Sequence, residues 1–118
     1  KITDRKKEII VNLGGDNISP SKIENLLCLN DKIKQSFVYG DKKTYLTALI
    51  VSESEENKKE IEIYLENLNK SLSLVEKVKK YKLIKEEFTI ENGMLTPTLK
   101  LKRKKILEKY KQDLEKLY

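Results

Sequence analysis

A lysine that closes a short threonine-containing segment is the first residue of this chain that could do chemistry. Residues 93–100 read GMLTPTLK, and a dense run of basic residues follows. Gly93, Pro97 and the two threonines predict an extended loop that ends at Lys100, just before a helix. A lysine on such a loop is placed to meet an anion, and its ammonium can neutralise a phosphate or a carboxylate.

The basic residues after Lys100 leave two other interpretations open. In residues 100–111, six lysines and Arg103 stand against one acid, Glu108. A nucleic-acid surface normally interleaves basic residues with stacking aromatics, and this segment has only Tyr110, at a position of its apolar stripe. Apolar residues also interrupt the charge. The segment therefore favours a solvated helix face over a nucleic-acid groove, and no nucleic-acid partner is expected.

The glycine pair Gly14 and Gly15, followed by Asp16, is the second stretch that could meet a ligand. It lies between a β-rich run and a predicted helix, so its backbone N–H groups can come close to a bound molecule. The stretch lacks the GxxxxGK[ST] pattern of a phosphate-binding loop, so we do not expect it to hold the phosphates of ATP. From these residues alone, a plain turn is the favoured interpretation.

Apolar spacing predicts the elements around the glycine turn. A short strand precedes Gly14, and Ser19 followed by Pro20 predicts the cap and first turn of a helix with Ile23 on its apolar face. The turn at residues 40–43 predicts a β-hairpin. Its second strand, residues 45–51, is almost entirely apolar or β-branched and is expected at the centre of a sheet.

Further along the chain, the pattern predicts two helices, a strand and a C-terminal helix. Ser52 with Glu55 resembles a capping box, and Ser73 with Glu76 predicts the start of a shorter helix. Residues 83–93 predict a strand with one apolar face. The positions expected to be buried are Ile61, Tyr64, Leu65, Leu68, Leu72, Val75, Val78, Ile84, Phe88, Ile90, Ile106, Tyr110, Leu114 and Leu117. Together these elements predict an α+β domain with a small mixed sheet and helices packed against it.

The composition narrows the class of function. The 118 residues carry a net charge of +6 and no linker-like stretch, so we expect one domain over residues 1–118 and anionic partners. Histidine is absent, which excludes His-dependent triads and His-containing zinc sites. The one cysteine, Cys28, lies in an apolar helical run and is predicted to be a buried structural thiol. We predict no metal ligands in this chain.

The distribution of charge and apolar residues also bears on location. Acids gather in residues 53–66, so the anion-facing surface is expected near the N-terminus and after Lys100. No apolar stretch of the sequence has membrane-spanning length, and no secretory apolar region stands at its start. We expect a reducing, cytoplasmic setting.

The two stretches, in this order and at this separation, resemble the C-terminal domain of the adenylate-forming acyl-CoA synthetase superfamily, the AMP-binding enzymes. The run TDRKKEIIVNLGGDNISPSKIE is similar to the hinge motif of that superfamily. The run LTPTLKLKRK resembles the terminal lysine motif of its long-chain fatty-acid–CoA ligase branch. The resemblance covers essentially the whole chain and implies a small lid domain excised from a longer protein.

The resemblance implies a two-step reaction. ATP and a fatty acid give an acyl-adenylate and pyrophosphate, and the thiol of CoA then displaces AMP to give a thioester. In the family, the small domain rotates between the steps and presents a different face each time. The ATP phosphate loop, the acyl tunnel and most of the Mg²⁺ ligands belong to a larger N-terminal domain, so we expect the isolated domain to be inactive.

The motifs also imply roles for individual residues. Lys100 corresponds to the lysine that reaches the adenylate in the first step. Lys7 matches the hinge position, whose backbone absorbs the rotation, and Arg5 matches an arginine that contacts the nucleotide near its ribose. Gly14, Gly15 and Asp16 match the turn that faces the pantetheine channel of CoA in the second step.

Three positions depart from the wider family pattern. Asp4 stands where a glycine is common, Glu8 replaces the more usual aspartate, and Leu99 precedes the lysine where many relatives have a glycine. Asp4 and Leu99 agree with the long-chain branch, so they narrow the assignment to it.

Some interpretations remain open beside the ligase. Lys102, Arg103, Lys104 and Lys105 are interpreted as one positive surface suited to the phosphates of CoA or to peripheral contact with an anionic membrane. A fatty acyl-AMP ligase, which hands its adenylate to a carrier protein, is the nearest rival. A non-catalytic basic module that binds nucleic acid or membrane is the rival from another class.

Overall fold

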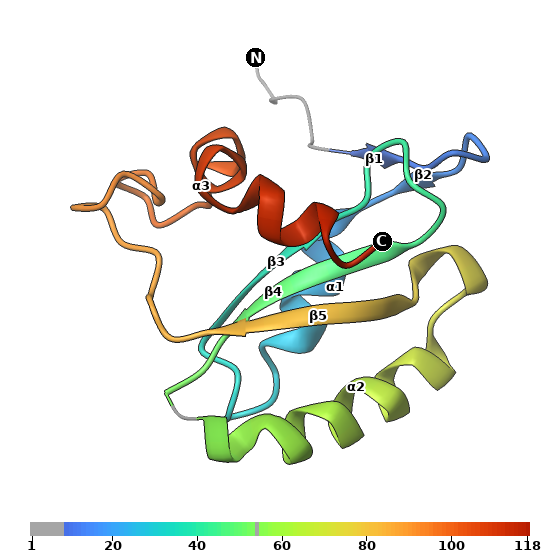
Figure 1. Cartoon of the computed structure of the whole chain (residues 1–118), viewed down its shortest axis with the longest axis horizontal. Coiled ribbons are helices and arrows are strands. Elements are labelled where there is room, and N and C mark those ends of the chain that lie inside the picture. Colours follow the sequence, from blue (N-terminus) through green and yellow to red (C-terminus); the bar gives the residue numbers. More distant parts are fainter. Residues whose placement is uncertain (1–8, 54) are drawn as a thin grey trace.

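The computed structural model describes residues 9–53 and 55–118 of the chain, with the backbone alone described at residue 55. Within these described residues, three α-helices and five strands follow one another (Figure 1). Their bounds are β1 (Ile10–Val11), β2 (Asn17–Ile18), α1 (Pro20–Leu27), β3 (Gln35–Tyr39), β4 (Leu46–Val51), α2 (Lys58–Ser71), β5 (Val78–Ile84) and α3 (Arg103–Glu115). Single 3-10 turns at Glu55–Asn57 and Leu74–Glu76 flank α2. The predicted α+β class is confirmed.

The main sheet has the order β3-β4-β5 and is mixed, because β4 pairs antiparallel with β3 and parallel with β5. All six residues of β4 are buried, which confirms its predicted central position. Such a strand needs apolar residues on both faces, and this explains its nearly unbroken apolar sequence.

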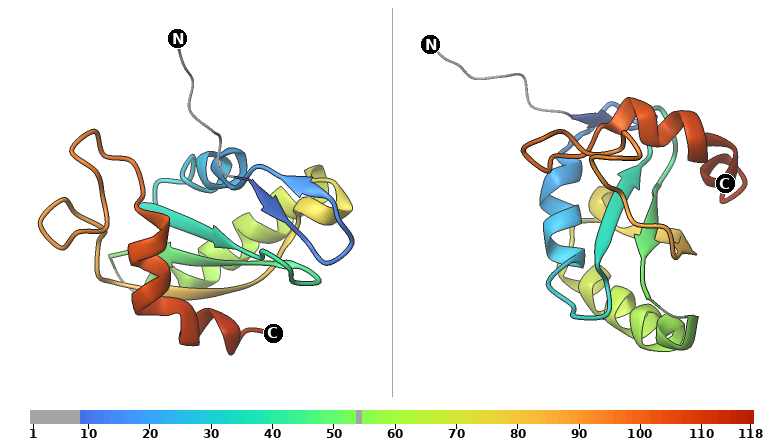
Figure 2. Two further views of the ribbon diagram at one scale, coloured as in Figure 1. Left: turned by 90° about the horizontal axis from the view of Figure 1, so that it is seen from above. Right: turned by 90° about the vertical axis from the view of Figure 1, so that its left-hand side faces the viewer.

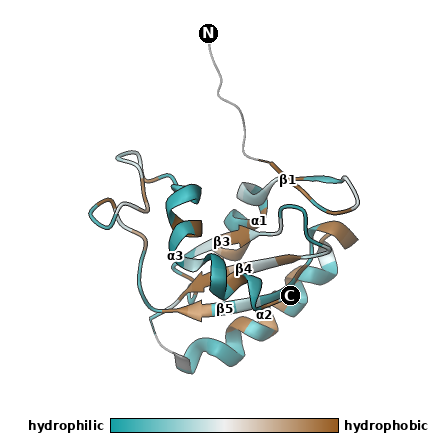
Figure 3. Ribbon diagram, turned by 45° about the horizontal axis from the view of Figure 1, so that its top comes forward, coloured by the Kyte–Doolittle hydropathy of each residue, from teal (hydrophilic) through white to brown (hydrophobic). Residues whose placement is uncertain are grey.

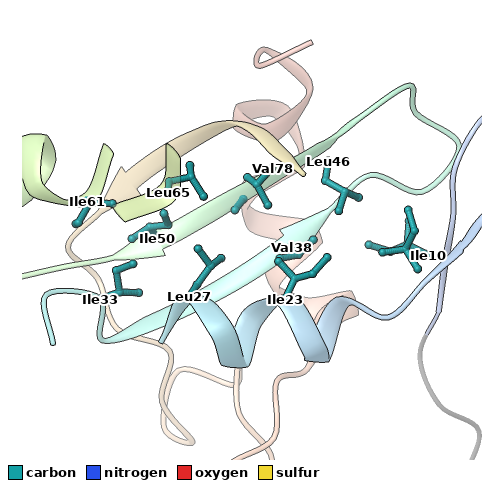
Figure 4. Packing of buried hydrophobic residues seen from close by; sticks show 12 residues of the cluster. Ile10, Ile23, Leu27, Ile33, Val38, Leu46, Ile50, Ile61, Leu65 and Val78 are labelled. Atoms are coloured by element: carbon teal, nitrogen blue, oxygen red, sulfur yellow. The ribbon is translucent and has the colours of Figure 1, made fainter. Parts of the chain in front are cut away.

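Two apolar clusters lie on opposite faces of this sheet. The first joins β3 and β4 to α1 and α2, with Ile23, Leu27, Ile50 and Ile61 fully buried (Figure 4). The second lies beneath α3, where the alternate strand residues meet the helix. Its buried members are Phe37, Leu49, Val51, Ile84, Phe88, Met94, Leu95, Ile106, Tyr110 and Leu114. Most residues of α3 are hydrophilic (Figure 3).

The small β1–β2 hairpin is attached to the turn between β3 and β4. The Leu13 N–H donates to the Lys43 carbonyl at 2.9 Å, and the Lys42 N–H donates to the Val11 carbonyl at 2.8 Å. The Val11 N–H donates to Asp41 Oδ1 at 3.2 Å. The segment that leads into the glycine turn is thus held to the β3–β4 turn by two backbone hydrogen bonds and one side-chain hydrogen bond.

The start of α1 agrees with the prediction. Ser19 is the N-cap, its Oγ accepts from the Lys22 N–H at 3.4 Å, and Pro20 occupies the first turn. Cys28, however, is not buried as predicted, because α1 ends at Leu27 and Cys28 is an exposed residue at its C-cap. Its Sγ lies 3.4 Å from Ser36 Oγ, and partial burial of the sulfur raises the pKa of the thiol. The thiol is therefore not activated as a nucleophile.

The strand predicted at residues 83–93 is wrong in position. β5 spans Val78–Ile84, and the chain then turns, with Asn92 Oδ1 accepting from the Thr89 N–H and the Asn92 N–H donating to Thr89 Oγ1. Ile90 is 47% exposed. Lysines along β5 hide its alternation, and such charges are typical of an edge strand, where they discourage pairing with another chain.

The starts of two predicted helices are also corrected. α2 begins at Lys58 after a 3-10 turn rather than directly after Ser52, whose buried hydroxyl accepts from Asn57 Nδ2 at 3.0 Å. The short helix expected from Ser73 is a single 3-10 turn, and Val78 begins β5 instead of lying on a helix. The Asn69 side chain bonds both the N–H and the carbonyl of Val78, which fixes the start of that strand.

Candidate functional site

Lys100 lies at the end of a tight hairpin rather than the extended loop predicted. Leu95 and Leu101 face each other in an antiparallel bridge. Between them, the Thr96 N–H donates to the Lys100 carbonyl at 2.8 Å, and the Leu99 N–H donates to the Thr96 carbonyl at 2.7 Å. The segment before α3 therefore has a defined shape that fixes the backbone of Lys100.

Thr96 organises this hairpin, a role that the sequence pattern did not reveal. Its Oγ1 accepts from the Lys100 N–H at 3.1 Å and lies 2.9 Å from Thr98 Oγ1. A hydroxyl that bonds a backbone N–H a few residues away is typical of Ser and Thr turns. Leu99, next to the lysine, has a φ of 67°, in the left-handed region that side chains rarely adopt.

A second turn, between Thr89 and Met94, precedes the hairpin of Lys100 and determines the direction of that hairpin. Gly93 has a φ of 83°, which glycine adopts without steric cost. The Met94 N–H donates to the Thr89 carbonyl and to Asn92 Oδ1, both at 3.1 Å, and the Lys102 N–H donates to the Met94 carbonyl at 2.8 Å. Met94 and Leu95 are buried, so the base of the hairpin is anchored in the core while its tip lies in solvent.

The Lys100 side chain is exposed and available to an anion. Within residues 9–53 and 55–118, no acidic oxygen lies at ion-pair distance from its ammonium. By contrast, Lys109, one turn and a half into α3, is paired with Glu86. Lys100 therefore presents a charge that no described acid of its own domain neutralises.

The glycine turn is open as well. The turn is closed by the Asn12 N–H donating to the Asp16 carbonyl at 3.1 Å and the Asp16 N–H donating to Asn12 Oδ1 at 2.8 Å. Gly15 has a φ of 87° and empty space where a Cβ would stand. At Gly14 a Cβ would meet only side-chain oxygens, at 3.6 Å or more. A narrow ligand can approach this backbone closely.

The two candidate surfaces lie at opposite ends of the molecule. The hairpin of Lys100 lies at one end of the longest axis, and the turn of the β1–β2 hairpin lies at the other (Figure 1). A view turned by 90° keeps them at opposite ends (Figure 2, left). Lys100 and the glycine turn therefore form two separate candidate surfaces rather than one.

The C-terminal end of α3 is tied to the β3–β4 turn, on which the glycine turn is also fixed. Lys43 Nζ lies 2.6 Å from Glu115 Oε1, and the Tyr39 hydroxyl donates to Glu115 Oε2 at 2.6 Å. The Tyr118 ring stacks on Tyr45 with 4.8 Å between centroids, and its hydroxyl donates to the Tyr45 carbonyl at 2.9 Å. These contacts fix the C-terminal end of α3, which is the end farther along the chain from Lys100.

Two predicted site residues, Lys7 and Arg5, lie outside the described residues. Arg103 departs from its predicted place on an exposed basic surface. Its guanidinium donates twice to the Glu24 carboxylate, and both side chains are largely buried. Sequence spacing could not reveal this pair, because its members lie 79 positions apart in the sequence.

Two further features of the described residues concern metal ions and membranes. Among the described residues, no three acidic or cysteine side chains lie close enough to hold a metal ion. None of the helices in the same part of the chain combines the length and apolar character needed to cross a membrane.

Comparison with known proteins identifies the family to which this chain belongs. A family model described as the AMP-binding enzyme C-terminal domain matches residues 7–118. The chain is 35% identical to the long-chain-fatty-acid–CoA ligase FadD15 of Mycobacterium tuberculosis, an alignment that covers 99% of this chain and 24% of that ligase. The chain thus spans about a quarter of the length of this curated relative.

Solved structures agree with the family match. The adenylation domain of a carboxylate reductase from Mycobacterium chelonae superposes with a TM-score of 0.84 at 28% identity, covering 95% of this chain and 19% of that one. The A-PCP didomain of a carboxylic acid reductase from Segniliparus rugosus, solved in complex with AMP, gives 0.82 at 27% identity, covering 98% and 18%.

Proposed function

Because this chain belongs to the family of AMP-binding enzyme C-terminal domains, we propose that it is the mobile C-terminal domain of a long-chain fatty-acid–CoA ligase. The observation that carries the proposal is the exposed Lys100 on a hydrogen-bonded hairpin, in a chain 35% identical to such a ligase. A larger N-terminal domain of the same polypeptide is the proposed partner. It supplies the ATP site, the acyl tunnel and the Mg²⁺ ligands.

In the first step, a fatty-acid carboxylate oxygen attacks the α-phosphorus of ATP. The bond from that phosphorus to the bridging oxygen breaks, and pyrophosphate leaves. The fatty-acid carboxylate and the α-phosphate are both anions and repel each other as they approach. The positive charge of the Lys100 ammonium reduces this repulsion and so lowers the activation barrier of adenylation. Its position on an exposed hairpin fits a group that enters the site with the domain and leaves with it.

In the second step, the CoA sulfur attacks the acyl carbonyl, the bond to the AMP oxygen breaks, and the thiol proton is lost to solvent. Gly14, Gly15 and Asp16 line the proposed approach of the narrow pantetheine arm. Open space at the Cβ position of Gly15 supports this role. Because the turn and Lys100 lie at opposite ends, a rotation of the domain brings each to the reaction centre in its own step (Figure 1).

Two further roles belong to the same proposal. Lys7 marks the backbone position about which the domain turns, and Arg5 contacts the nucleotide near its ribose. We place the ligase in the cytoplasm, with the exposed lysines Lys102, Lys104 and Lys105 suited to CoA phosphates or to peripheral contact with an anionic membrane.

The test compares half-reactions of wild type and Lys100→Ala in the full-length ligase. Loss of the charge lowers fatty-acid-dependent pyrophosphate release by roughly 100- to 1,000-fold, as for other groups that stabilise transition-state charge. Thioester formation from preformed acyl-adenylate and CoA stays near wild type. Lys111→Ala, which removes a charge from the exposed face of α3, is the matched control. Unchanged adenylation in Lys100→Ala would refute the proposal.

A carrier protein is the second candidate acceptor for the acyl group. The observation that favours it is the close superposition on carboxylic acid reductase adenylation domains, one of them solved as an A-PCP didomain. Offering the wild-type enzyme CoA and a phosphopantetheinyl carrier protein separately distinguishes the two. Thioester formed on CoA supports the ligase, and thioester formed only on the carrier supports the alternative.

A further inference from the structure

The buried pair of Arg103 and Glu24 stands immediately beside the hairpin of Lys100. Arg103 Nη1 donates to Glu24 Oε2 and Nη2 donates to Glu24 Oε1, each at 2.6 Å. The side chain of Glu24 is 8% exposed and that of Arg103 is 15% exposed. The two parallel bonds of such a fork fix the orientation of the guanidinium as well as its position.

Three elements meet at this pair. Glu24 lies on α1, and its Oε2 also accepts from the Val38 N–H of β3 at 2.8 Å. The guanidinium of Arg103 lies 5.5 Å from the ring centroid of Phe37, the preceding residue of β3. Arg103 is the first residue of α3. The pair therefore fixes the start of α3 against a helix and a strand that belong to the core.

The start of α3 is covalently and structurally continuous with the hairpin. Only Leu101 and Lys102 separate Arg103 from Lys100. Leu101 forms the antiparallel bridge with Leu95, and the Lys102 N–H donates to the Met94 carbonyl. Both residues are thus part of the stem that carries Lys100. A displacement of the Arg103 backbone would move this stem directly.

The energetics of buried ion pairs favour a positioning role. Removing two charges from water offsets much of their attraction, so such pairs contribute little to stability compared with apolar residues of similar size. Their geometry, however, is closely defined. The exposed Lys109–Glu86 pair, also on α3, lacks this burial, with both side chains 46% exposed.

We propose that Arg103 and Glu24 are positioning residues for the adenylation step, because they hold the base of the hairpin so that Lys100 meets the reacting anions. The inference rests on the proposed function of Lys100. It assigns to Arg103 a role apart from the basic surface around it. The structural part of the proposal, that the pair restrains residues 94–101, does not depend on the reaction.

The test uses the full-length ligase with Arg103→Met, Arg103→Lys and the double variant Glu24→Gln/Arg103→Met. Lys109→Met serves as a matched control on the same helix. In Arg103→Met, kcat for adenylation falls at least tenfold, with KM for ATP and the thioester half-reaction near wild type. Arg103→Lys recovers part of the loss, because one charge contact remains without the fork. Amide hydrogen exchange in residues 94–101 accelerates in Arg103→Met and stays unchanged in Lys109→Met.

The double variant removes both charges. It allows the same measurement if Arg103→Met alone does not fold because Glu24 has lost the guanidinium of Arg103. It supports the proposal if it folds and loses adenylation selectively. An equal loss in both half-reactions with unchanged exchange in the hairpin overturns the positioning role and leaves a general structural one. If Lys100→Ala does not affect adenylation while Arg103→Met still loosens the hairpin, the proposed function fails and only the restraint remains.

Discussion

At the scale of single residues, Leu99 combines two unfavourable features. Its φ is 67°, and its side chain is 68% exposed. The left-handed conformation costs a non-glycine residue about 1–2 kcal/mol, and an exposed leucine recovers little of this by packing. The hairpin therefore holds the residue before Lys100 in a strained conformation.

This strain predicts the effect of Leu99→Asn. Asparagine tolerates the left-handed region, so the free energy of unfolding of the chain rises by about 1 kcal/mol. Chemical denaturation of the two proteins measures the difference. Leu74→Asn is the matched control, because Leu74 is 74% exposed and has an ordinary φ. A Leu99→Asn chain no more stable than wild type would show that the conformation carries no strain.

Single residues also show which features of the candidate site can be predicted from the sequence alone. The exposed segment that carries Lys100 and the turn at the glycine pair can be predicted because their signals are local: a loop composition before a lysine, and two adjacent glycines. The roles of Lys100 and of the glycine turn stay predictions. The partnership of Arg103 with Glu24 joins residues 79 positions apart, so neither its burial nor its geometry appears in any short window. The role of Thr96 is local but depends on a backbone bend that composition does not specify.

At the scale of elements, α3 is held at both ends. The Arg103–Glu24 pair fixes its start, and contacts of Glu115 and Tyr118 fix its end to β3 and the β3–β4 turn. Burial raises the pKa of Tyr118 to about 12. The hydrogen bond from Lys43 lowers the pKa of the Glu115 carboxyl, which favours its charged form.

The raised pKa predicts a loss of stability in alkali. An unfolded tyrosine ionises near pH 10, whereas folded Tyr118 stays neutral until about pH 12. Its contribution is therefore complete below about pH 10 and is lost as the pH rises toward about 12. Denaturation of the chain at several pH values measures this decline. Tyr118→Phe makes the decline shallower, and an unchanged slope in that variant would contradict the assignment.

Elements are predictable where one face is regularly apolar. The stripe of Ile106, Tyr110 and Leu114 predicts α3, and the apolar run of β4 predicts its central place. The pattern fails at β5, because an edge strand tolerates lysines on both sides and loses its alternation. It also places a strand at residues 83–93, where Ile84 and Phe88 are buried but the chain then turns between Thr89 and Asn92.

At the scale of the whole molecule, the two candidate surfaces lie at opposite ends of the longest axis (Figures 1 and 2). Gly14 offers a probe for the second surface. Its φ lies outside the left-handed region, and a Cβ there would make only ordinary contacts, so alanine fits this position without strain. Any effect of added bulk at Gly14 then reports the approach of a ligand.

The most direct measurement compares Lys100→Ala with the series Gly14→Ala and Gly14→Leu in both half-reactions of the full-length ligase. The proposed function predicts that Lys100→Ala and the Gly14 variants lose different half-reactions. Lys100→Ala loses adenylation and keeps thioester formation, whereas the Gly14 variants keep adenylation and lose thioester formation, roughly tenfold or more for leucine and less for alanine. If the Gly14 variants leave thioester formation unchanged, or if either substitution lowers both steps equally, the division of the two steps between opposite ends of the domain is contradicted.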